Sequence, residues 1–354
     1  MKKILFIAGA KPNYPRNSNN LKLLRQNFEV KEITCSANSY IKRFLNVGFR
    51  FIFSKKDADA IYIGFMGHPL VILAKIFSRK PIIFDVFISL YDSICFDRKI
   101  FKPNSLIGKI AYFLDKTSCA WADTIITDTQ AHADWFAKTF NLPPAKFKSF
   151  YICADPTLFK PLQKPHDNKF IIEFHGGFIP LQGVDTIIRA AKILENQADI
   201  IFNILGKGPT LDSVKKLAEE LKIKNIVFYD KFIPIEELPA FINQGDLALG
   251  IFGTVDKTFR VIPNKAFEAV ACGKPLITCD SEAIREVFKD GESLILCRAG
   301  DPQDLADKIL KLKNDPGLRQ KIAENGHEAF NKVCNFNSLK NQLAEIISNT
   351  IIKI

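Results

Sequence analysis

The sequence KFIIEFHGGFIPLQGVD occupies residues 169–185 and decides the fold class. Its first part is a short apolar run, which predicts a buried strand. The glycine pair Gly176 and Gly177 follows directly and predicts a tight turn. A helical period then begins at Asp185 and continues to Leu194. A strand, a glycine turn and a helix in this order form the repeating unit of a parallel α/β sheet.

The same order recurs on both sides of this stretch. In the second half, the predicted strands are residues 169–176, 199–206, 225–230, 246–252 and 274–280. In the first half, they are residues 2–8, 30–34, 60–65, 81–87 and 122–129. Two such series predict an α/β protein with two doubly wound, Rossmann-like domains.

The domain boundary is expected near residue 163, because the passage 151–169 contains several prolines and polar residues, as a linker does. The predicted domains are therefore residues 1–162 and 163–334. The opening apolar run is too short for a signal peptide, and the longest apolar stretch, residues 61–77, is broken by glycine, proline and charge. A cytoplasmic protein is expected.

The net charge of +11 lies wholly in the first half of the chain. Residues 1–160 contain 24 Lys and Arg against 12 Asp and Glu, whereas the remainder is close to neutral. Basic clusters near residues 42–43, 55–56, 79–80 and 98–102 favour a surface that faces an anionic membrane, lipid phosphate or an acidic polymer. An ordinary solvated surface explains them equally well. Nucleic acid is not expected, because no recognisable basic and aromatic module is present.

The eight cysteines form no CxxC pair and do not cluster with the five histidines. Reduced core thiols are therefore expected, and neither a metal site nor a cofactor is predicted.

Three loops in the second half carry the candidate chemistry, since ligands of doubly wound sheets bind beyond the carboxyl ends of the strands. The first loop contains Gly176, Gly177 and Gln182. The second is the strand-to-helix turn ILGKGP at residues 204–209, with Gly206, Lys207 and Gly208. Glycines there allow a ligand to approach the backbone closely. The second loop lacks the spacing and the downstream acid of a dinucleotide fingerprint, which argues against an NAD enzyme.

The third loop, residues 260–275, is the most specific. Pro263 and Asn264 suit the beginning of a helix, and Lys265 and Glu268 lie three residues apart on one helical face. These two could form an ordinary exposed ion pair. Alternatively, the helix N-terminus with Lys265 and Arg260 would neutralise a diphosphate, while Glu268 would accept hydrogen bonds from ribose hydroxyls.

These segments resemble the retaining glycosyltransferases of the GT-B fold, family 4, also called group 1. The likeness rests on HGGFIPLQGVD at 175–185, ILGKGP at 204–209 and the long segment from Pro263 to Leu312. It implies two Rossmann-like domains facing a central cleft, with a nucleotide-sugar donor (UDP or GDP) on the C-terminal domain and an acceptor on the N-terminal one. It also implies no metal requirement, and a final helix, about residues 335–354, that returns to the first domain.

The chain departs from the family pattern at three positions. Gly177 and Gln182 stand where members usually have an arginine and a lysine, and Arg260 stands where the first of two paired glutamates is usual. Glu268 matches the second glutamate. Positive charge is therefore predicted to have moved to Arg260 and Lys265, which would stabilise the leaving diphosphate.

In the first half, Arg16 is a candidate phosphate contact, and Asp85 and Asp92 are candidate acids that orient an acceptor hydroxyl. The resemblance favours transfer of a hexose-type sugar to a glycan or lipid-linked acceptor, in cell-surface polysaccharide or glycolipid synthesis. A cytoplasmic location is expected, either free or peripheral on the inner face of the membrane. Two alternatives stay open. One is a GT-B sugar-nucleotide epimerase, and the other is a non-catalytic subunit that binds sugar nucleotides or glycans.

Overall fold

The computed structural model describes residues 1–54, 57–151, 153–163 and 168–352 and divides the chain into two compact units. The N-terminal unit comprises Met1–Ile152 and Asn335–Ile354, and the C-terminal unit comprises Cys153–Cys334. The division lies ten residues before the predicted boundary. Residues 153–162 group with the C-terminal unit, where the backbone N–H of Leu162 donates to the side chain of Asn243 at 2.9 Å.

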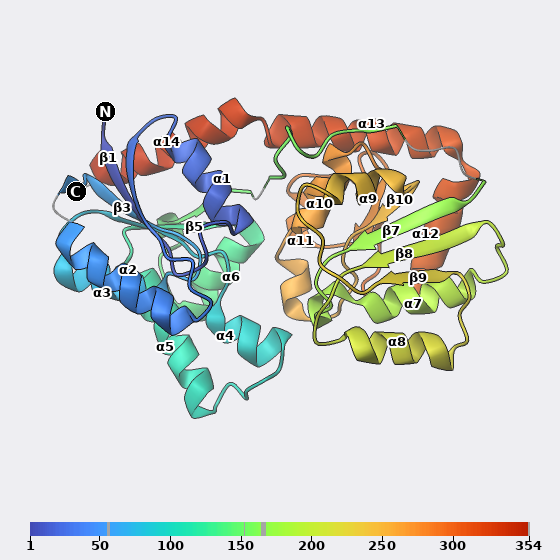
Figure 1. Cartoon of the computed structure of the whole chain (residues 1–354), viewed down its shortest axis with the longest axis horizontal. Helices are drawn as coiled ribbons and strands as arrows, with labels where there is room; N and C mark the ends of the chain where they lie inside the picture. The colour runs from blue at the N-terminus through green and yellow to red at the C-terminus, as the bar shows by residue number, and fades with distance from the viewer. Residues whose placement is uncertain (55–56, 152, 164–167, 353–354) are drawn as a thin grey trace. The chain divides into compact units, whose positions relative to one another are not determined.

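The N-terminal unit is built on a parallel six-stranded sheet in the order β2-β1-β3-β4-β5-β6 (Figure 1). The strands are β1 (Lys3–Ile7), β2 (Glu29–Ile33), β3 (Ala60–Ile63), β4 (Ile82–Asp85), β5 (Thr124–Thr127) and β6 (Phe147–Ser149). The helices are α1 (Pro15–Leu24), α2 (Tyr40–Ser54), α3 (His68–Phe77), α4 (Leu90–Asp92), α5 (Leu106–Trp121), α6 (Gln130–Phe140) and α14 (Phe336–Ile352), with a π-turn, η2 (Ser93–Asp97), after α4. Helix α3 packs between α2 and α5, whereas α1 packs against α14.

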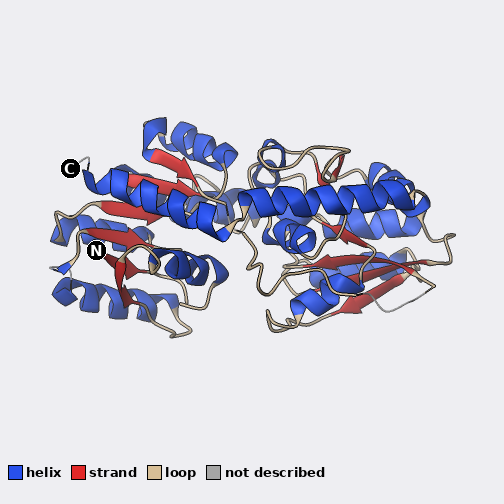
Figure 2. Ribbon diagram, turned by 90° about the horizontal axis from the view of Figure 1, so that it is seen from above, coloured by secondary structure: helices blue, strands red, loops and turns tan. Residues whose placement is uncertain are grey.

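The C-terminal unit repeats this plan, with the strand order β12-β11-β10-β7-β8-β9 and all pairs parallel. Its strands are β7 (Phe170–His175), β8 (Ile200–Leu205), β9 (Ile226–Tyr229), β10 (Leu247–Leu249), β11 (Leu276–Cys279) and β12 (Ile295–Cys297). Its α-helices are α7 (Val184–Ile193), α8 (Leu211–Glu220), α9 (Leu238–Gln244), α10 (Asn264–Ala271), α11 (Glu282–Arg285), α12 (Pro302–Asn314) and α13 (Pro316–Val333). Figure 2 shows helices on both faces of each sheet.

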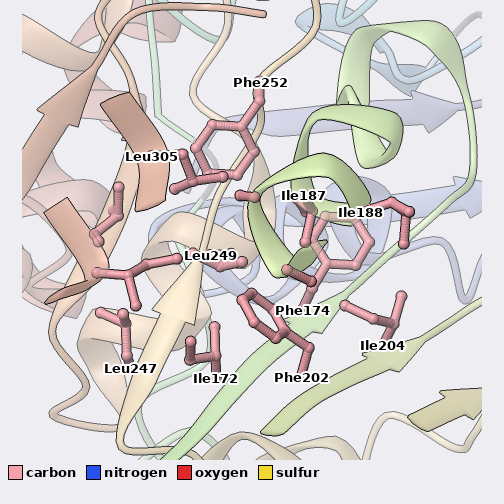
Figure 3. Close-up of a cluster of buried hydrophobic side chains, with 14 of the residues drawn as sticks. Ile172, Phe174, Ile187, Ile188, Phe202, Ile204, Leu247, Leu249, Phe252 and Leu305 are labelled. Carbon is pink, nitrogen blue, oxygen red and sulfur yellow. The ribbon is translucent and has the colours of Figure 1, made fainter. Parts of the chain in front are cut away.

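The core of the C-terminal unit forms where the apolar strand runs meet the apolar stripe of α7. Ile172, Phe174 and Phe202 on the sheet pack with Ile187 and Ile188 of α7, and all five are fully buried (Figure 3). Strands buried on both faces read as continuous apolar runs, which is why the sequence revealed them. The ten predicted strands are present. The two strands that the prediction missed, β6 and β12, are three-residue edge strands.

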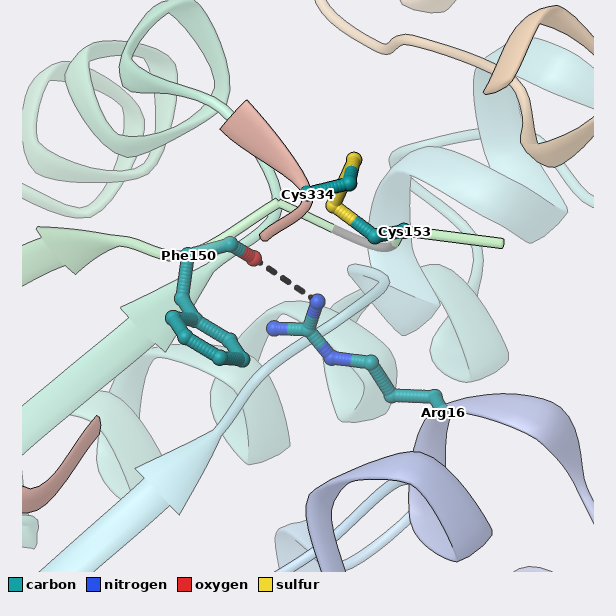
Figure 4. Close-up of a disulfide and its surroundings, with 4 residues drawn as sticks. All are labelled: Arg16, Phe150, Cys153 and Cys334. Carbon is teal, nitrogen blue, oxygen red and sulfur yellow. Dashed lines mark hydrogen bonds between the residues drawn. A yellow bond between two sulfur atoms is a disulfide. The ribbon is translucent and has the colours of Figure 1, made fainter. Parts of the chain in front are cut away.

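The prediction that all cysteines are reduced is wrong for one pair. Cys153 and Cys334 are joined by a disulfide within the C-terminal unit, across 181 residues of sequence (Figure 4). The pair lies at the two ends of that unit, so the bridge closes the unit on itself. The cysteines at 35, 95, 119, 272, 279 and 297 are free thiols.

No helix in the described ranges is long and apolar enough to cross a membrane. The predicted basic cluster at residues 55–56 lies outside the described residues.

Candidate functional site

The candidate site lies where strand β7 ends, at the middle of the C-terminal sheet. Strand β7 pairs with β8 on one side and with β10 on the other, so the strand order reverses between β7 and β10. Doubly wound sheets bind ligands at the carboxyl edge of such a reversal. Glu173 and His175 lie two residues apart on β7, which directs both side chains to the same face of the sheet.

His175 bridges two carboxylates inside the protein. Its Nδ1 lies 2.9 Å from Oε2 of Glu173, and its Nε2 lies 2.9 Å from Oε2 of Glu268 on α10. Burial disfavours the charged imidazole, but the two carboxylates outweigh it and raise the pKa of His175 to about 9. At neutral pH the ring is therefore an imidazolium that donates a hydrogen bond to each acid. We call these three residues the carboxylate–histidine relay.

Lys265 lies one turn before Glu268 on α10 and is only 4% exposed. Its Nζ donates to Oε1 of Gln182 at 2.5 Å and lies 3.4 Å from the ring centre of Phe174, a cation–π distance. Burial holds the pKa of Lys265 well below that of an ordinary lysine, although Glu173 and Glu268 pull it upward. The alternative of an exposed Lys265–Glu268 ion pair is wrong, because Glu268 is also buried.

The glycines of the first two loops are required by close contact between the loops. Gly176 and Gly206 adopt φ of +147° and +145°, which side chains rarely allow. A Cβ on Gly206 would lie 1.9 Å from the carbonyl oxygen of Gly176, and one on Gly208 would lie 2.4 Å from that of Phe178. In contrast, a Cβ on Gly177 would meet no atom within 4 Å. The position of the missing family arginine is therefore open space.

Helix α10 begins at Asn264, directly after the extended residue Pro263. No side chain among the described residues caps its first turn. Free amides at a helix N-terminus attract anions, so the diphosphate predicted for this turn stays a prediction. Lys207 is half exposed, with its Nζ 4.0 Å from Oδ1 of Asp230, so the second loop places its cation at the surface.

Arg260 is half-buried directly after the turn η5 (Asp256–Phe259). It lines an open pocket of about 510 Å³ in the C-terminal unit. Arg285 lines the same pocket and pairs with Asp280 through two hydrogen bonds of 2.6 and 2.8 Å. Arg260 thus borders an open pocket, whereas Lys265 is buried beside the relay.

Sequence reasoning missed the roles of Glu173 and His175. Their signal was present, since two ionisable residues two apart interrupt an otherwise apolar strand run. A buried charge in such a run requires a partner. The residue that links them to the third loop, Glu268, is 93 positions away from His175.

The predicted roles of Arg16 and Asp85 conflict with the structure. Arg16 is 1% exposed and Asp85 is 0% exposed, and the guanidinium binds the carboxylate through Nε and Nη2, at distances down to 2.8 Å. Nη1 of Arg16 donates to the carbonyl oxygen of Phe150 (Figure 4). Asn20 also donates to Asp85, at 2.7 Å. We therefore reassign this pair from ligand binding to the packing of the N-terminal unit.

Asp92 is likewise 2% exposed at the end of the short helix α4. A carboxylate so placed does not reach an acceptor without movement of its surroundings. Within the described residues, no group of three acidic, histidine or cysteine side chains is arranged to hold a metal ion.

The two parallel sheets, each with helices on both faces, define the GT-B class of fold, with two Rossmann-like units. Crystal structures of Anabaena HepE with UDP and with UDP-glucose align with 99% of this chain and all of that chain, at TM-scores of 0.74 and 0.75 and 18% identity. At this identity the likeness concerns the fold alone.

Residues 155–329 match the family described as glycosyl transferases group 1, and this segment of the chain belongs to that family. An uncharacterized glycosyltransferase of Methanocaldococcus jannaschii is 29% identical over 45% of this chain and 42% of its own length. A lipopolysaccharide core biosynthesis glycosyltransferase of Rhizobium meliloti is 27% identical over 50% of this chain and 48% of its own. The chain spans about half the length of the curated relatives it matches.

Proposed function

We propose that the protein is a glycosyltransferase that moves a sugar from a nucleotide-diphosphate donor to an acceptor, with retention at the transferred carbon. The carboxylate–histidine relay beside the N-terminus of α10 is the observation that carries the proposal. The oriented carboxylate of Glu268 and the cation of Lys265 lie one helical turn apart on α10, at the reversal of strand order in the sheet.

Glu268 is the proposed contact to the ribose of the donor. Its Oε2 accepts from His175, which fixes the carboxylate, and its Oε1 is proposed to accept from the ribose hydroxyls. Glu173 in turn fixes the ring of His175. A ligand-binding group whose orientation is set by a second layer of hydrogen bonds loses little conformational entropy on binding.

The diphosphate is proposed to bind at the first turn of α10, with Lys265 and Arg260 supplying positive charge. Developing charge on the leaving diphosphate is stabilised by oriented amides and cations. A diphosphate beside Lys265 also raises the pKa of that amine, because an opposite charge favours the protonated form. In this scheme no bound metal is required, and the donor phosphate assists the incoming hydroxyl.

The acceptor is proposed to be a glycan or a lipid-linked glycan that meets the N-terminal unit at the cytoplasmic face of a membrane. This unit contains 25 Lys and Arg against 12 Asp and Glu, or +13, whereas the C-terminal unit is at −2. The similarity to a lipopolysaccharide core biosynthesis glycosyltransferase of Rhizobium meliloti supports an acceptor of this class.

The donor assignment is tested by thermal denaturation with UDP, GDP and their sugar conjugates. A nucleotide at 100 times its Kd is expected to add about 2.7 kcal/mol of stability. Replacing UDP by 2′-deoxy-UDP should weaken binding to the wild type but not to Glu268→Ala, which has no side-chain group left to bond the ribose hydroxyl. Absence of any nucleotide-dependent shift, or equal sensitivity of both proteins to the deoxy analogue, would refute the assignment. Release of an epimerised sugar nucleotide instead of transfer would identify the epimerase alternative.

A further inference from the structure

Helix α2 is apolar on two opposite faces. Val47 and Phe51 on one face are fully buried in the core of the N-terminal unit. The other face repeats every four residues and is 61–72% exposed, with Ile41, Leu45, Phe49 and Phe53. A helix that is hydrophobic all round requires an apolar environment on every side. The fold supplies that environment for the inner face only.

Helix α5, which packs against α3, also exposes apolar side chains. Leu106 is 75% exposed, and Ile110 and Phe113 are 48% and 61% exposed. Helix α3, which packs between α2 and α5, adds Ile76 at 63% (Figure 1). We call these exposed side chains of α2, α3 and α5 the α2–α5 face. Soluble monomers rarely expose apolar surface on this scale unless it meets a partner.

The exposed charges on α2, α3 and α5 themselves are all positive. Residues 40–54 contain no Asp or Glu, and the one acid of α5, Asp115, is 0% exposed. The exposed cations include Lys42 and Arg50 on α2 and Lys109 on α5. An apolar stripe flanked by lysine and arginine is the pattern of helices that lie in the interface of a bilayer.

We propose that the α2–α5 face docks on an anionic lipid bilayer, with its aromatic and aliphatic side chains at the boundary of the acyl chains and its cations among the headgroups. A second copy of the chain suits this face poorly, because its cations would then oppose one another. What rests on the proposed function is only the purpose of docking, which is to bring the enzyme to a lipid-linked acceptor. The docking itself requires no catalysis.

The test is flotation of the full chain with vesicles of phosphatidylcholine alone and with vesicles containing roughly one third phosphatidylglycerol. Binding is expected to the anionic vesicles and to weaken with salt. The variant Leu45→Gln with Phe49→Gln should lower the partition coefficient at least 10-fold, on the order expected for two lost apolar anchors. Lys42→Gln with Lys109→Gln should lower it about 5-fold for each lysine at low salt.

Phe232→Gln with Ile235→Gln is the matched control, since these exposed residues belong to the C-terminal unit, at 74% and 40%. This variant should bind vesicles as the wild type does. Thermal shift with UDP, measured on every variant, reports the donor site separately from docking. Three results overturn the proposal: no flotation of the wild type with anionic vesicles, equal losses in the matched control, or a wild-type dimer that Leu45→Gln with Phe49→Gln dissociates.

Discussion

Nε2 of His175 lies 2.9 Å from Oε2 of Glu268, although 93 residues separate the two in the sequence. The same ring holds Glu173 at 2.9 Å through Nδ1. One buried imidazolium thus keeps two acids of like charge together. This contact joins the first and third predicted loops into one site.

The relay predicts a stability that depends on pH. The folded state raises the pKa of His175 to about 9, so its contribution is complete below the unfolded histidine pKa of about 6.5 and is lost as the pH rises through the folded value. We expect the free energy of unfolding to fall by about 3 kcal/mol across this window, relative to His175→Gln. Chemical denaturation of both proteins across the window measures the difference. The lowered pKa of Lys265 makes stability rise with pH instead. Because Lys265 is present in both proteins, its contribution largely cancels in the difference between them. Parallel pH profiles would show that His175 is not the titrating group.

The diphosphate assignment predicts that Arg260→Ala and Lys265→Ala each lose roughly 10- to 100-fold in kcat/KM, or about 1.4 to 3 kcal/mol. Lys265→Met, which keeps the length of the buried side chain, separates lost charge from lost packing. Arg298→Ala serves as the control, because that side chain is 76% exposed in a surface ion pair. Steady-state kinetics with the donor identified by thermal shift provide the measurement. Wild-type rates in both Arg260→Ala and Lys265→Met would remove these residues from the mechanism.

The glycine loops predict that two alanine substitutions differ greatly in their effect on stability. Gly206→Ala places a methyl group 1.9 Å from the Gly176 carbonyl at a φ of +145°, and we expect a loss on the order of 3 kcal/mol or more. Gly177→Ala meets no atom within 4 Å, and its stability should change by less than about 0.5 kcal/mol. Thermal denaturation compares them directly. Gly177→Arg, which restores the charge usual in the family, should fold normally and bind UDP more tightly.

The disulfide predicts a redox-dependent stability. Under oxidising conditions, Cys153→Ser should be less stable than the wild type by about 2 to 4 kcal/mol, because the bridge restricts the unfolded chain. In reductant, the two proteins should unfold alike. Cys35→Ser, which removes a free thiol, is the control. Mass spectrometry of the unreduced protein should find two of the eight cysteines blocked, and eight reactive thiols would contradict the pairing.

Local sequence patterns were sufficient for much of this architecture. Apolar runs and helical periods depend on near neighbours, so they indicated ten of the twelve strands in the described residues and the turn at Pro263. The edge strands β6 and β12 escaped because β6 (Phe147–Ser149) contains a single apolar residue and the apolar run of β12 ends at Cys297, whereas the run of the equally short β10 continues into Ile251 and Phe252. The spacing of Lys265 and Glu268 correctly put them on one helical face, but it left open whether that face met water.

The sequence by itself determined the parallel α/β class, the two-unit organisation and the three glycine-containing loops of the candidate site. Only the tertiary structure decided which charges neutralise one another. It buried Arg16 against Asp85, set His175 between two glutamates and directed Lys265 to Gln182. The physical reason is that ionic and hydrogen-bond energies depend on distance and burial, and for residues tens of positions apart neither is fixed until the chain has folded.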